Sequence, residues 1–390
     1  MEPKTSLIRG IKRTAASLTE SDEVRIKTFL DWCKRECLGV SEKVKIGCDG
    51  SCAQFGMVAT ADISEGEHLF EIPHQLLLTP DTTAIAQLLQ KEKDSIISGS
   101  GWVPLLLALM YEYTNPTSRW RPYTQLVPDF DELDLPMFWP KNQVDQYLAG
   151  TGVVKAVTKD LTSLTEEFHT IVLPFVKQHA NIFPSECQSL EFYKKMVAFV
   201  MAYSFTEPCG EDVDDDVTQQ VTPPVMVPMA DVLNHIAKNN AHLNFGKEVL
   251  TMVAKVPIKK GEEIFNTYGE LANFQLLHMY GFAEPYPNNH FDTVELAMRL
   301  VGDVITRDAA VLGLEDAEEK WAFLRKQELV CEDGAWVLGA EGILTEDETY
   351  HTLKVLAMNK NKFKEYVEND GWSETDSEKD DSTCESLTNG

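Results

Sequence analysis

This sequence has no apolar run long enough to cross a bilayer and no N-terminal segment of the kind that directs secretion. Its longest apolar stretch, residues 196–205, is closed by Lys195 and Glu207, whereas a membrane-spanning helix needs roughly 20 apolar residues. Residues 1–6 lack the hydrophobic core of a signal peptide. We therefore expect a protein of the cytosol or nucleus with no membrane partner.

Basic residues are scarce. The 35 lysines and arginines are outnumbered by 62 aspartates and glutamates, which gives a formal net charge of −27. Binding to the phosphate backbone of a nucleic acid requires the opposite sign, so no direct nucleic-acid contact is expected. A basic segment of another protein is a better partner for an acidic surface, and the charge would speed their encounter at low salt.

The sequence also lacks paired Cys-x2-Cys spacing. Its 8 cysteines are scattered. Cys33 with Cys37 and Cys48 with Cys52 leave a zinc clip open as an alternative, but their helical and loop spacings favour free thiols. We expect reduced cysteines and no bound metal.

Hydrophobic patterning predicts short β-strands on either side of a long helical stretch. Residues 56–60 and 67–73 are predicted strands, with a turn between them in which Gly66 is free to take a positive φ. A similar strand–turn–strand pattern recurs around residues 250–262. Helices are predicted at 21–37, 102–114, 158–178, 190–204, 271–280, 318–328 and 345–367. Gly281 is expected to end the helix at 271–280.

This segregation of strands and helices indicates an α+β fold. A chain of 390 residues is long enough for two folded domains. The predicted divisions are a tail and helix at 1–40, a main domain at 41–287 with a helical insertion at about 100–222, a helical region at 288–367, and an acidic disordered tail at 368–390.

Two separate motifs contain the residues most suited to chemistry. Segment 227–235, Val-Pro-Met-Ala-Asp-Val-Leu-Asn-His, ends in an Asn-His pair, and Asp231 within it is interpreted as a helix or turn cap. Segment 261–269, Gly-Glu-Glu-Ile-Phe-Asn-Thr-Tyr-Gly, is a turn followed by a short strand that ends in Tyr-Gly. We expect the two segments to fold side by side around one pocket.

With several further motifs, these segments resemble the SET domain of the Rubisco large-subunit methyltransferase class over residues 43–284. The further motifs are Gln-Phe-Gly-Met-Val-Ala at 54–59, Gly-Glu-His-Leu-Phe-Glu-Ile-Pro at 66–73, Ser-Arg-Trp-Arg-Pro-Tyr at 118–123, Pro-Met-Phe-Trp-Pro at 136–140, Met-Ala-Tyr-Ser-Phe at 201–205 and His-Met-Tyr-Gly-Phe-Ala-Glu-Pro at 278–285. Each motif is modest alone, but their order and spacing make coincidence improbable.

The resemblance implies an S-adenosylmethionine-dependent protein-lysine N-methyltransferase with a SET β-fold and a pseudoknot-like active site. Its partner would be a protein that presents a lysine, a non-histone protein in the first place, with histones as a further class. The nucleus is the implied location, with the cytoplasm as the alternative. Arg9, Lys12 and Arg13 leave a nuclear-import patch open, although a solvated tail is favoured.

The resemblance also assigns site residues. Tyr268 is implied as the catalytic residue beside the sulfonium. The implied cofactor-binding residues are Ala53, Gln54, Phe55, Tyr203, Asn234, His235 and Tyr280. The implied substrate-binding residues are Trp102, Ser204 and Thr206. In this class the histidine binds cofactor and supports the fold, so His235 is not interpreted as a general base.

Two departures from the class pattern stand out. The loop at Ala-Gln-Phe-Gly, 53–56, differs from the more usual Gly-x-Gly, and Tyr203 stands where many members carry arginine. The region after residue 288 is also short for a substrate-binding helical domain. Three alternatives stay open: a histidine methyltransferase of the same class, a catalytically silent SET-fold binding module, and plain core packing for Tyr203, Tyr280 and Trp102. The sequence leaves the oligomeric state open.

Overall fold

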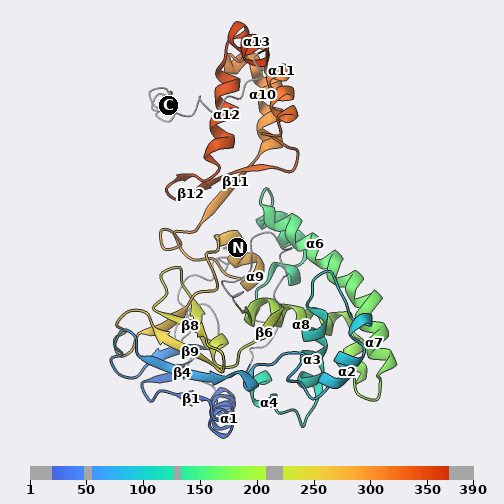
Figure 1. The fold of residues 1–390 in the computed structure, drawn as a ribbon, viewed down its shortest axis with the longest axis vertical. Helices are drawn as coiled ribbons and strands as arrows, with labels where there is room; N and C mark the ends of the chain where they lie inside the picture. Colours follow the sequence, from blue (N-terminus) through green and yellow to red (C-terminus); the bar gives the residue numbers. More distant parts are fainter. Residues whose placement is uncertain (1–19, 48–54, 127–132, 208–222, 369–390) are drawn as a thin grey trace, which may run out of the picture. The chain divides into compact units, whose positions relative to one another are not determined.

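The described residues fold into two compact units, which divide between Phe291 and Asp292 (Figure 1). Each unit has its own hydrophobic core. The computed structural model describes residues 20–47, 55–126, 133–207 and 223–368. The predictions for Cys48, Cys52, the basic N-terminal group and the acidic tail fall outside these residues, apart from residue 368, which ends a helix. No helix among the described residues has the length and apolar character that a bilayer crossing needs.

The strands of the first unit form two four-stranded sheets and a two-stranded one. The first sheet has the order β1 (Gly39–Val40), β4 (His68–Pro73), β9 (Val249–Ala254), β8 (Ala241–Phe245). The second has the order β2 (Val44–Gly47), β3 (Gly56–Ala59), β10 (Glu263–Asn266), β7 (Asn234–His235). β5 (Ser204–Thr206) pairs with β6 (Pro224–Met226). All pairings within these sheets are antiparallel except that of β7 with β10, which is parallel.

The two strands predicted at 56–60 and 67–73 are confirmed as β3 and β4, but they do not pair with each other. β3 lies between β2 and β10, whereas β4 lies between β1 and β9. The turn before β4 does contain a left-handed residue, because Gly66 has a φ of 77°. This turn therefore passes the chain from one sheet to the other and does not close a hairpin.

Helices cover the other part of the first unit. They are α1 (Glu20–Arg35), α2 (Ala86–Lys91), α3 (Val103–Thr114), α4 (Arg121–Thr124), α5 (Lys141–Tyr147), α6 (Gly152–Glu167), α7 (Leu173–Gln178), α8 (Leu190–Tyr203) and α9 (Asn273–Tyr280). Short 3₁₀ segments lie at η1 (His74–Leu76), η2 (Lys93–Ser95), η4 (Pro136–Phe138), η6 (Ser185–Gln188) and η7 (Ala230–Val232). A π-helical turn, η5 (Phe168–Val172), joins α6 to α7. The predicted helix at 158–178 thus begins earlier, at Gly152, and contains this π turn.

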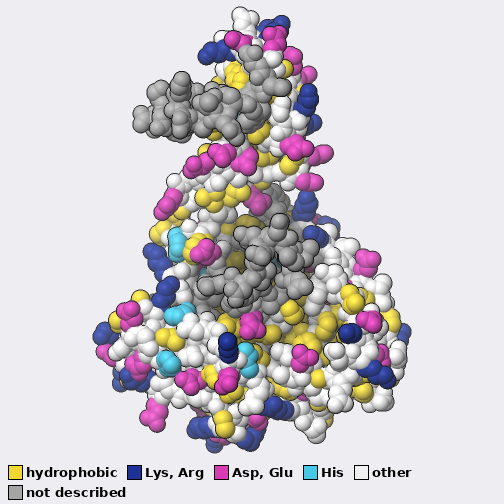
Figure 2. Space-filling view, in the orientation of Figure 1, with side chains coloured by type: hydrophobic (Ala, Val, Ile, Leu, Met, Phe, Trp, Pro, Cys, Tyr) yellow, Lys and Arg dark blue, Asp and Glu magenta, His cyan; other side chains and the backbone are white. Residues whose placement is uncertain are grey.

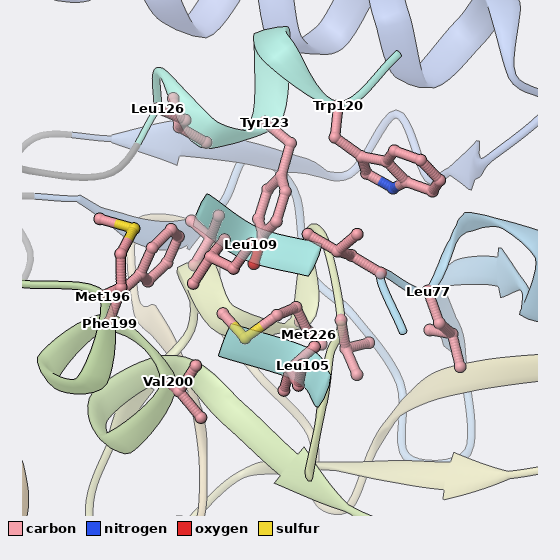
Figure 3. Close-up of a cluster of buried hydrophobic side chains, with 14 of the residues drawn as sticks. Leu77, Leu105, Leu109, Trp120, Tyr123, Leu126, Met196, Phe199, Val200 and Met226 are labelled. Carbon is pink, nitrogen blue, oxygen red and sulfur yellow. The ribbon is translucent and has the colours of Figure 1, made fainter. Parts of the chain in front are cut away.

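The core of the first unit is built around α3. Leu105 and Leu109 of α3 belong to the same cluster of buried side chains as Phe199 of α8 and Tyr123 of α4 (Figure 3). Tyr123 is 1% exposed, and its ring lies 6.2 Å from that of Phe199. α3 is buried on nearly all sides, which is typical of a helix in the interior of a domain.

The second unit combines a small sheet with four helices. Its antiparallel sheet contains β11 (Thr293–Ala297), β12 (Ala335–Gly339) and β13 (Gly342–Ile343). Its helices are α10 (Met298–Leu312), α11 (Ala317–Lys326), α12 (Glu346–Ala357) and α13 (Lys360–Glu368). The sequence analysis predicted only helices here and missed β11, which is five residues long and largely exposed, so its alternating residues mark no buried face.

The single helix predicted at 345–367 is divided into α12 and α13. The buried Lys320 of α11 lies at this break, where its Nζ donates to the carbonyl oxygens of Leu356 and Met358. These carbonyls have no partner within the helix that ends there. The lysine therefore satisfies the C-terminal end of α12.

The first prediction concerns two glycines of the first unit. Gly281 ends α9 with a φ of 77°, as predicted, and an added Cβ there would lie 2.8 Å from the backbone oxygen of Asp134. Gly66 has the same φ of 77°, but no described atom lies within 4 Å of its Cβ position. Gly66→Ala should lower the free energy of unfolding by about 1–2 kcal/mol from backbone conformation alone. Gly281→Ala should lower it by a further ~1–3 kcal/mol, because the crowded atoms belong to the backbone.

Urea denaturation of the two variants and the wild type measures this difference. Equal losses for Gly66→Ala and Gly281→Ala would show that the contact of Gly281 with residues 134–135 is not tight.

Candidate active site

The two predicted motifs lie side by side in the second sheet. β7 pairs in parallel with β10, with Asn234 opposite Phe265 and His235 opposite Asn266. Parallel neighbours cannot be joined by a tight turn, and the chain passes through β8 and β9 of the other sheet between them. The prediction that these segments fold together is confirmed.

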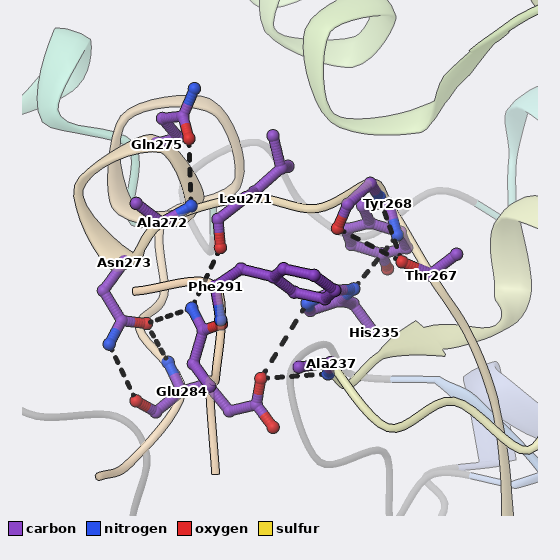
Figure 4. A network of polar contacts seen from close by, with 12 residues as sticks. His235, Ala237, Thr267, Tyr268, Leu271, Ala272, Asn273, Gln275, Glu284 and Phe291 are labelled. Carbon is purple, nitrogen blue, oxygen red and sulfur yellow. Dashed lines mark hydrogen bonds and ion pairs between the residues drawn. The ribbon is translucent and has the colours of Figure 1, made fainter. Parts of the chain in front are cut away.

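Tyr268 follows β10, and both its backbone N–H and its hydroxyl group donate hydrogen bonds within the protein. Its backbone N–H donates to His235 Nδ1 at 3.0 Å (Figure 4). Its hydroxyl donates to the carbonyl oxygen of Leu233 at 3.1 Å. Because its hydrogen is used in this bond, the phenol oxygen presents acceptor lone pairs to any further group.

Aromatic rings surround Tyr268. Its ring centroid lies 4.6 Å from that of Tyr280 and 5.2 Å from that of His235, and Phe282 packs edge-on at 6.3 Å. Burial raises the pKa of Tyr280 to about 12, so this phenol is neutral at pH 7. The rings form an uncharged surface, and aromatic faces attract a cation through their quadrupoles.

His235 is a neutral imidazole in a defined tautomer. It is 1% exposed, and burial lowers its pKa to about 4. Since Nδ1 accepts the N–H of Tyr268, the ring hydrogen is on Nε2, and Nε2 faces Glu284 Oε2 at 3.9 Å. The nitrogen that could accept a proton is already occupied, so His235 is not placed to act as a general base.

Glu284 holds the far side of His235 through a buried network. Its carboxylate accepts the N–H of Ala237 at 3.0 Å. Its backbone N–H and carbonyl are bound to the side chain of Asn273 at 2.8 and 3.0 Å (Figure 4). Asn289 donates in turn to Asn273 Oδ1 at 3.3 Å. The segment after α9 is thereby fixed against the segment after β7.

Asn234 uses both hydrogens of its side-chain amide. It is 1% exposed, and its Nδ2 donates to the carbonyl oxygen of Phe55 at 3.1 Å and to Glu263 Oε1 at 2.7 Å. Phe55 directly precedes β3. The side chain of Asn234 therefore links β7 to β10 and to the end of the predicted cofactor loop. Ala53 and Gln54 of that loop lie outside the described residues.

Asp231 caps the turn that leads into β7, in agreement with its interpretation from the sequence. Its carboxylate accepts the Tyr123 hydroxyl at 2.6 Å and the backbone N–H groups of Asp231 and Met229. Met229 is fully buried at a φ of 82°, which is uncommon for a residue with a side chain. Burial raises the pKa of Asp231 to about 7, while the hydrogen bonds oppose that rise.

Two more predicted residues, Tyr203 and Ser204, lie where α8 passes into β5. The ring of Tyr203 packs against Phe199 at 5.5 Å, and Phe199 packs in turn at 6.2 Å against Tyr123, the partner of Asp231. Ser204 lies opposite Met226 of β6, directly before the segment 227–235. Both residues are therefore connected to the turn that precedes Asn234.

The remaining two predicted residues lie at separate points of the fold. Thr206 is exposed in β5, opposite Pro224. Trp102 directly precedes α3, and its backbone N–H donates to Ser100 Oγ at 3.1 Å. Their contacts neither support nor oppose a role toward substrate, so both assignments stay predictions.

The described contacts thus join one group of predicted residues: Phe55, Asn234, His235, Tyr268 and Tyr280. Sequence reasoning missed three side chains that hold this group and the turn before it, namely Glu263, Glu284 and, through Asp231, Tyr123. All three stand within the quoted motifs. A partner could not be assigned to any of them, because the partners lie 108, 29 and 49 residues away for Asp231–Tyr123, Asn234–Glu263 and His235–Glu284.

Comparison with known proteins adds a family and a set of relatives. The SET domain family matches residues 54–269. The N-lysine methyltransferase SETD6 of Mus musculus is 49% identical over 358 residues, which cover 90% of this chain and 74% of the mouse protein. The protein of the same name from Homo sapiens is 44% identical over 389 residues, which cover 92% of this chain and 80% of the human protein.

Solved structures show the same fold. The SET domain of LSMT bound to lysine and AdoHcy matches with a TM-score of 0.59 at 19% identity, over 88% of this chain and 75% of that one. Rubisco LSMT bound to AdoMet matches with a TM-score of 0.59 at 18% identity, over 88% of this chain and 74% of that one. The predicted α+β fold is confirmed.

The second prediction concerns Asp231. The folded chain keeps a proton on this carboxyl up to a pH of about 7, whereas the unfolded chain releases it near 3.8. The contribution of this carboxyl to stability is therefore fully present below pH 3.8, its pKa in the unfolded chain, and is lost as the pH rises through about 7, its pKa in the folded chain. Over this range the free energy of unfolding falls by at most ~1.4 kcal/mol per pH unit. Asp231→Asn should remove this decline. Urea unfolding at about pH 5, 6, 7 and 8 gives the change of the free energy of unfolding with pH for each protein. The same pH dependence in variant and wild type would contradict the prediction.

Proposed function

This chain belongs to the SET-domain family and is a protein N-lysine methyltransferase, and on that premise we propose which of its residues bind the cofactor and perform the transfer. The observation on which the proposal rests is the double attachment of Tyr268, through its N–H to His235 and through its hydroxyl to Leu233. It holds a phenol oxygen next to the Asn-His segment within an aromatic cluster.

The methyl donor is S-adenosylmethionine, and Rubisco LSMT, which shares this fold, has been solved with AdoMet bound. When bound, it would supply a sulfonium methyl group, whose carbon a neutral amine attacks in line as the C–S bond breaks and neutral S-adenosylhomocysteine leaves. The residues present fit such a cation. Tyr268 and Tyr280 offer aromatic faces, and His235 brings no positive charge because its pKa is lowered to about 4. Asn234, His235 and Phe55 are the residues proposed to hold the cofactor, with Tyr203 at the adjoining end of α8.

Tyr268 is proposed as the catalytic residue that orients the lysine amine. Its hydroxyl hydrogen is donated to Leu233, so its oxygen accepts an N–H of the incoming amine. A free lysine has a pKa of about 10.4, and removing its proton near pH 7 costs about 4–5 kcal/mol. The uncharged aromatic cluster lowers that cost by disfavouring the charged ammonium. Holding the amine in line contributes several further kcal/mol.

The substrate is a protein that presents a lysine. We propose a non-histone protein of the nucleus as the first target, with histones and the cytoplasm as the alternatives. The net charge of −27 supports a target lysine within a basic segment. Acidic side chains are spread over the face in Figure 2, with basic ones interspersed. Trp102, Ser204 and Thr206 remain the residues proposed to contact that segment.

The purified chain, incubated with isotope-labelled S-adenosylmethionine and separate nuclear and cytosolic extracts, tests this proposal. Mass spectrometry of the labelled proteins should find the methyl group on lysine Nζ, mainly in non-histone proteins of the nuclear fraction. A methyl group on imidazole alone would contradict the lysine assignment. Label found only on cytosolic proteins would contradict the location.

The third prediction is that Tyr268→Phe lowers kcat by about 100-fold or more, a loss typical of removing one positioned polar group from a transition state. The ring contacts with Tyr280 and His235 are retained in this variant, so cofactor affinity should change by less than about threefold. Tyr147→Phe serves as the control, because Tyr147 is a surface residue of α5 with 43% exposure. Unchanged turnover in Tyr268→Phe would remove the assigned role.

The fourth prediction is that Asn234→Ala raises the dissociation constant of the cofactor by about tenfold or more, since two hydrogen bonds that hold β7 against its neighbours are lost. Calorimetric titration with S-adenosylhomocysteine measures this constant without any turnover. Wild-type affinity in the variant would contradict the assignment of Asn234.

A further inference from the structure

The side-chain amide of Asn234 has one permitted orientation. Its nitrogen lies between two groups that can only accept, the carbonyl oxygen of Phe55 and the carboxylate of Glu263. An amide turned by half a rotation would place its own oxygen against both acceptors. The two hydrogens of Nδ2 are therefore used within the protein, and Oδ1 is the part of the amide left to bind a ligand.

Glu263 makes the stronger of these two contacts. Its Oε1 lies 2.7 Å from Asn234 Nδ2, compared with 3.1 Å for the oxygen of Phe55. A hydrogen bond to a carboxylate is shorter than a neutral one and roughly twice as strong. The orientation of the amide thus depends mainly on Glu263.

The backbone around Glu263 is itself held in place. Glu263 is paired with Val58 of β3. On the other side, Asn240 Nδ2 donates to the carbonyl oxygen of Glu263 at 3.0 Å, and Asn240 Oδ1 accepts the N–H of Phe265 at 2.7 Å. One asparagine side chain therefore binds β10 on both sides of Ile264. A carboxylate on a backbone fixed in this way can orient its partner without moving.

We propose that Glu263 is a positioning residue of the cofactor site, which fixes the amide of Asn234 so that its Oδ1 accepts a hydrogen bond from an N–H donor of the cofactor. The inference rests on the proposed role of Asn234. It extends that role by making the affinity of the cofactor depend on a carboxylate that acts through the amide of Asn234.

The test compares Glu263→Ala, Glu263→Gln and Glu262→Ala. Glu262 directly precedes β10, is exposed, and bonds through its carboxylate to the N–H of Lys259 at 2.7 Å, so it controls for loss of one negative charge at the same point of the chain. In calorimetric titrations with S-adenosylhomocysteine, Glu263→Ala should raise the dissociation constant by about tenfold or more. Glu263→Gln keeps an acceptor oxygen and should stay within about threefold of wild type, and Glu262→Ala within about twofold.

The separation of kcat from binding gives a second readout. At saturating S-adenosylmethionine, kcat of Glu263→Ala should remain within about twofold of wild type, because Tyr268 and its contacts are untouched. A fall in kcat of the same size as the loss in affinity would overturn the proposal, since it would mean a general distortion of β10.

A double-mutant cycle separates positioning from strand support. In the Asn234→Ala background, Glu263→Ala should change the dissociation constant by less than about twofold, because the group that it orients is gone. A loss of equal size in both backgrounds, or wild-type affinity in the single variant, would overturn the proposal. Failure of the proposed function is distinguishable, because the wild-type chain would then not bind S-adenosylhomocysteine at all.

Discussion

The site depends on the parallel pairing of β7 with β10. This ladder joins Asn234 to Phe265 and His235 to Asn266, which is too short to be stable by itself. Side chains complete it. The hydroxyl of Tyr268 reaches back to Leu233, and the amide of Asn234 reaches to Glu263. The polar groups of the site are thus also the contacts that hold its two segments together.

The charges around this pairing favour a cationic ligand. His235 is neutral at pH 7, because burial lowers its pKa to about 4, and the phenol of Tyr280, whose pKa burial raises to about 12, is neutral as well. The nearby carboxylates of Glu263 and Glu284 are bound to Asn234 and Ala237. An aromatic surface without positive charge, backed by acids, attracts a sulfonium or an ammonium and would repel an anion. A lysine methyltransferase needs this balance, because donor and acceptor are both positively charged before the amine loses its proton.

Local features of this fold were predictable from the sequence, and pairings across the chain were not. Strands β3 and β4 and the end of α9 at Gly281 follow from alternation and from turn chemistry within a few residues. The placement of β3 and β4 in different sheets depends on β10 and β9, which lie far along the chain. The acids Glu263 and Glu284 look like ordinary surface residues in sequence, and they gain a role only when Asn234 and His235 arrive beside them. The strand β11 alternates polar and apolar residues over only five positions and is largely exposed, so this short pattern did not mark it as part of a sheet.

The turn before β7 explains why a buried acid is retained there. Met229 is fully buried at a φ of 82°, a backbone conformation that costs of order 1–3 kcal/mol for a residue with a side chain. The carboxylate of Asp231 accepts the N–H of Met229 and the hydroxyl of Tyr123, and these bonds offset the strain. Burying the carboxyl is itself unfavourable, as its raised pKa of about 7 records. The contacts of the Asp231 carboxyl group with Tyr123 and Met229 hold the turn in this form, and the chain leaves it directed so that the carbonyl oxygen of Leu233 accepts the hydroxyl hydrogen of Tyr268.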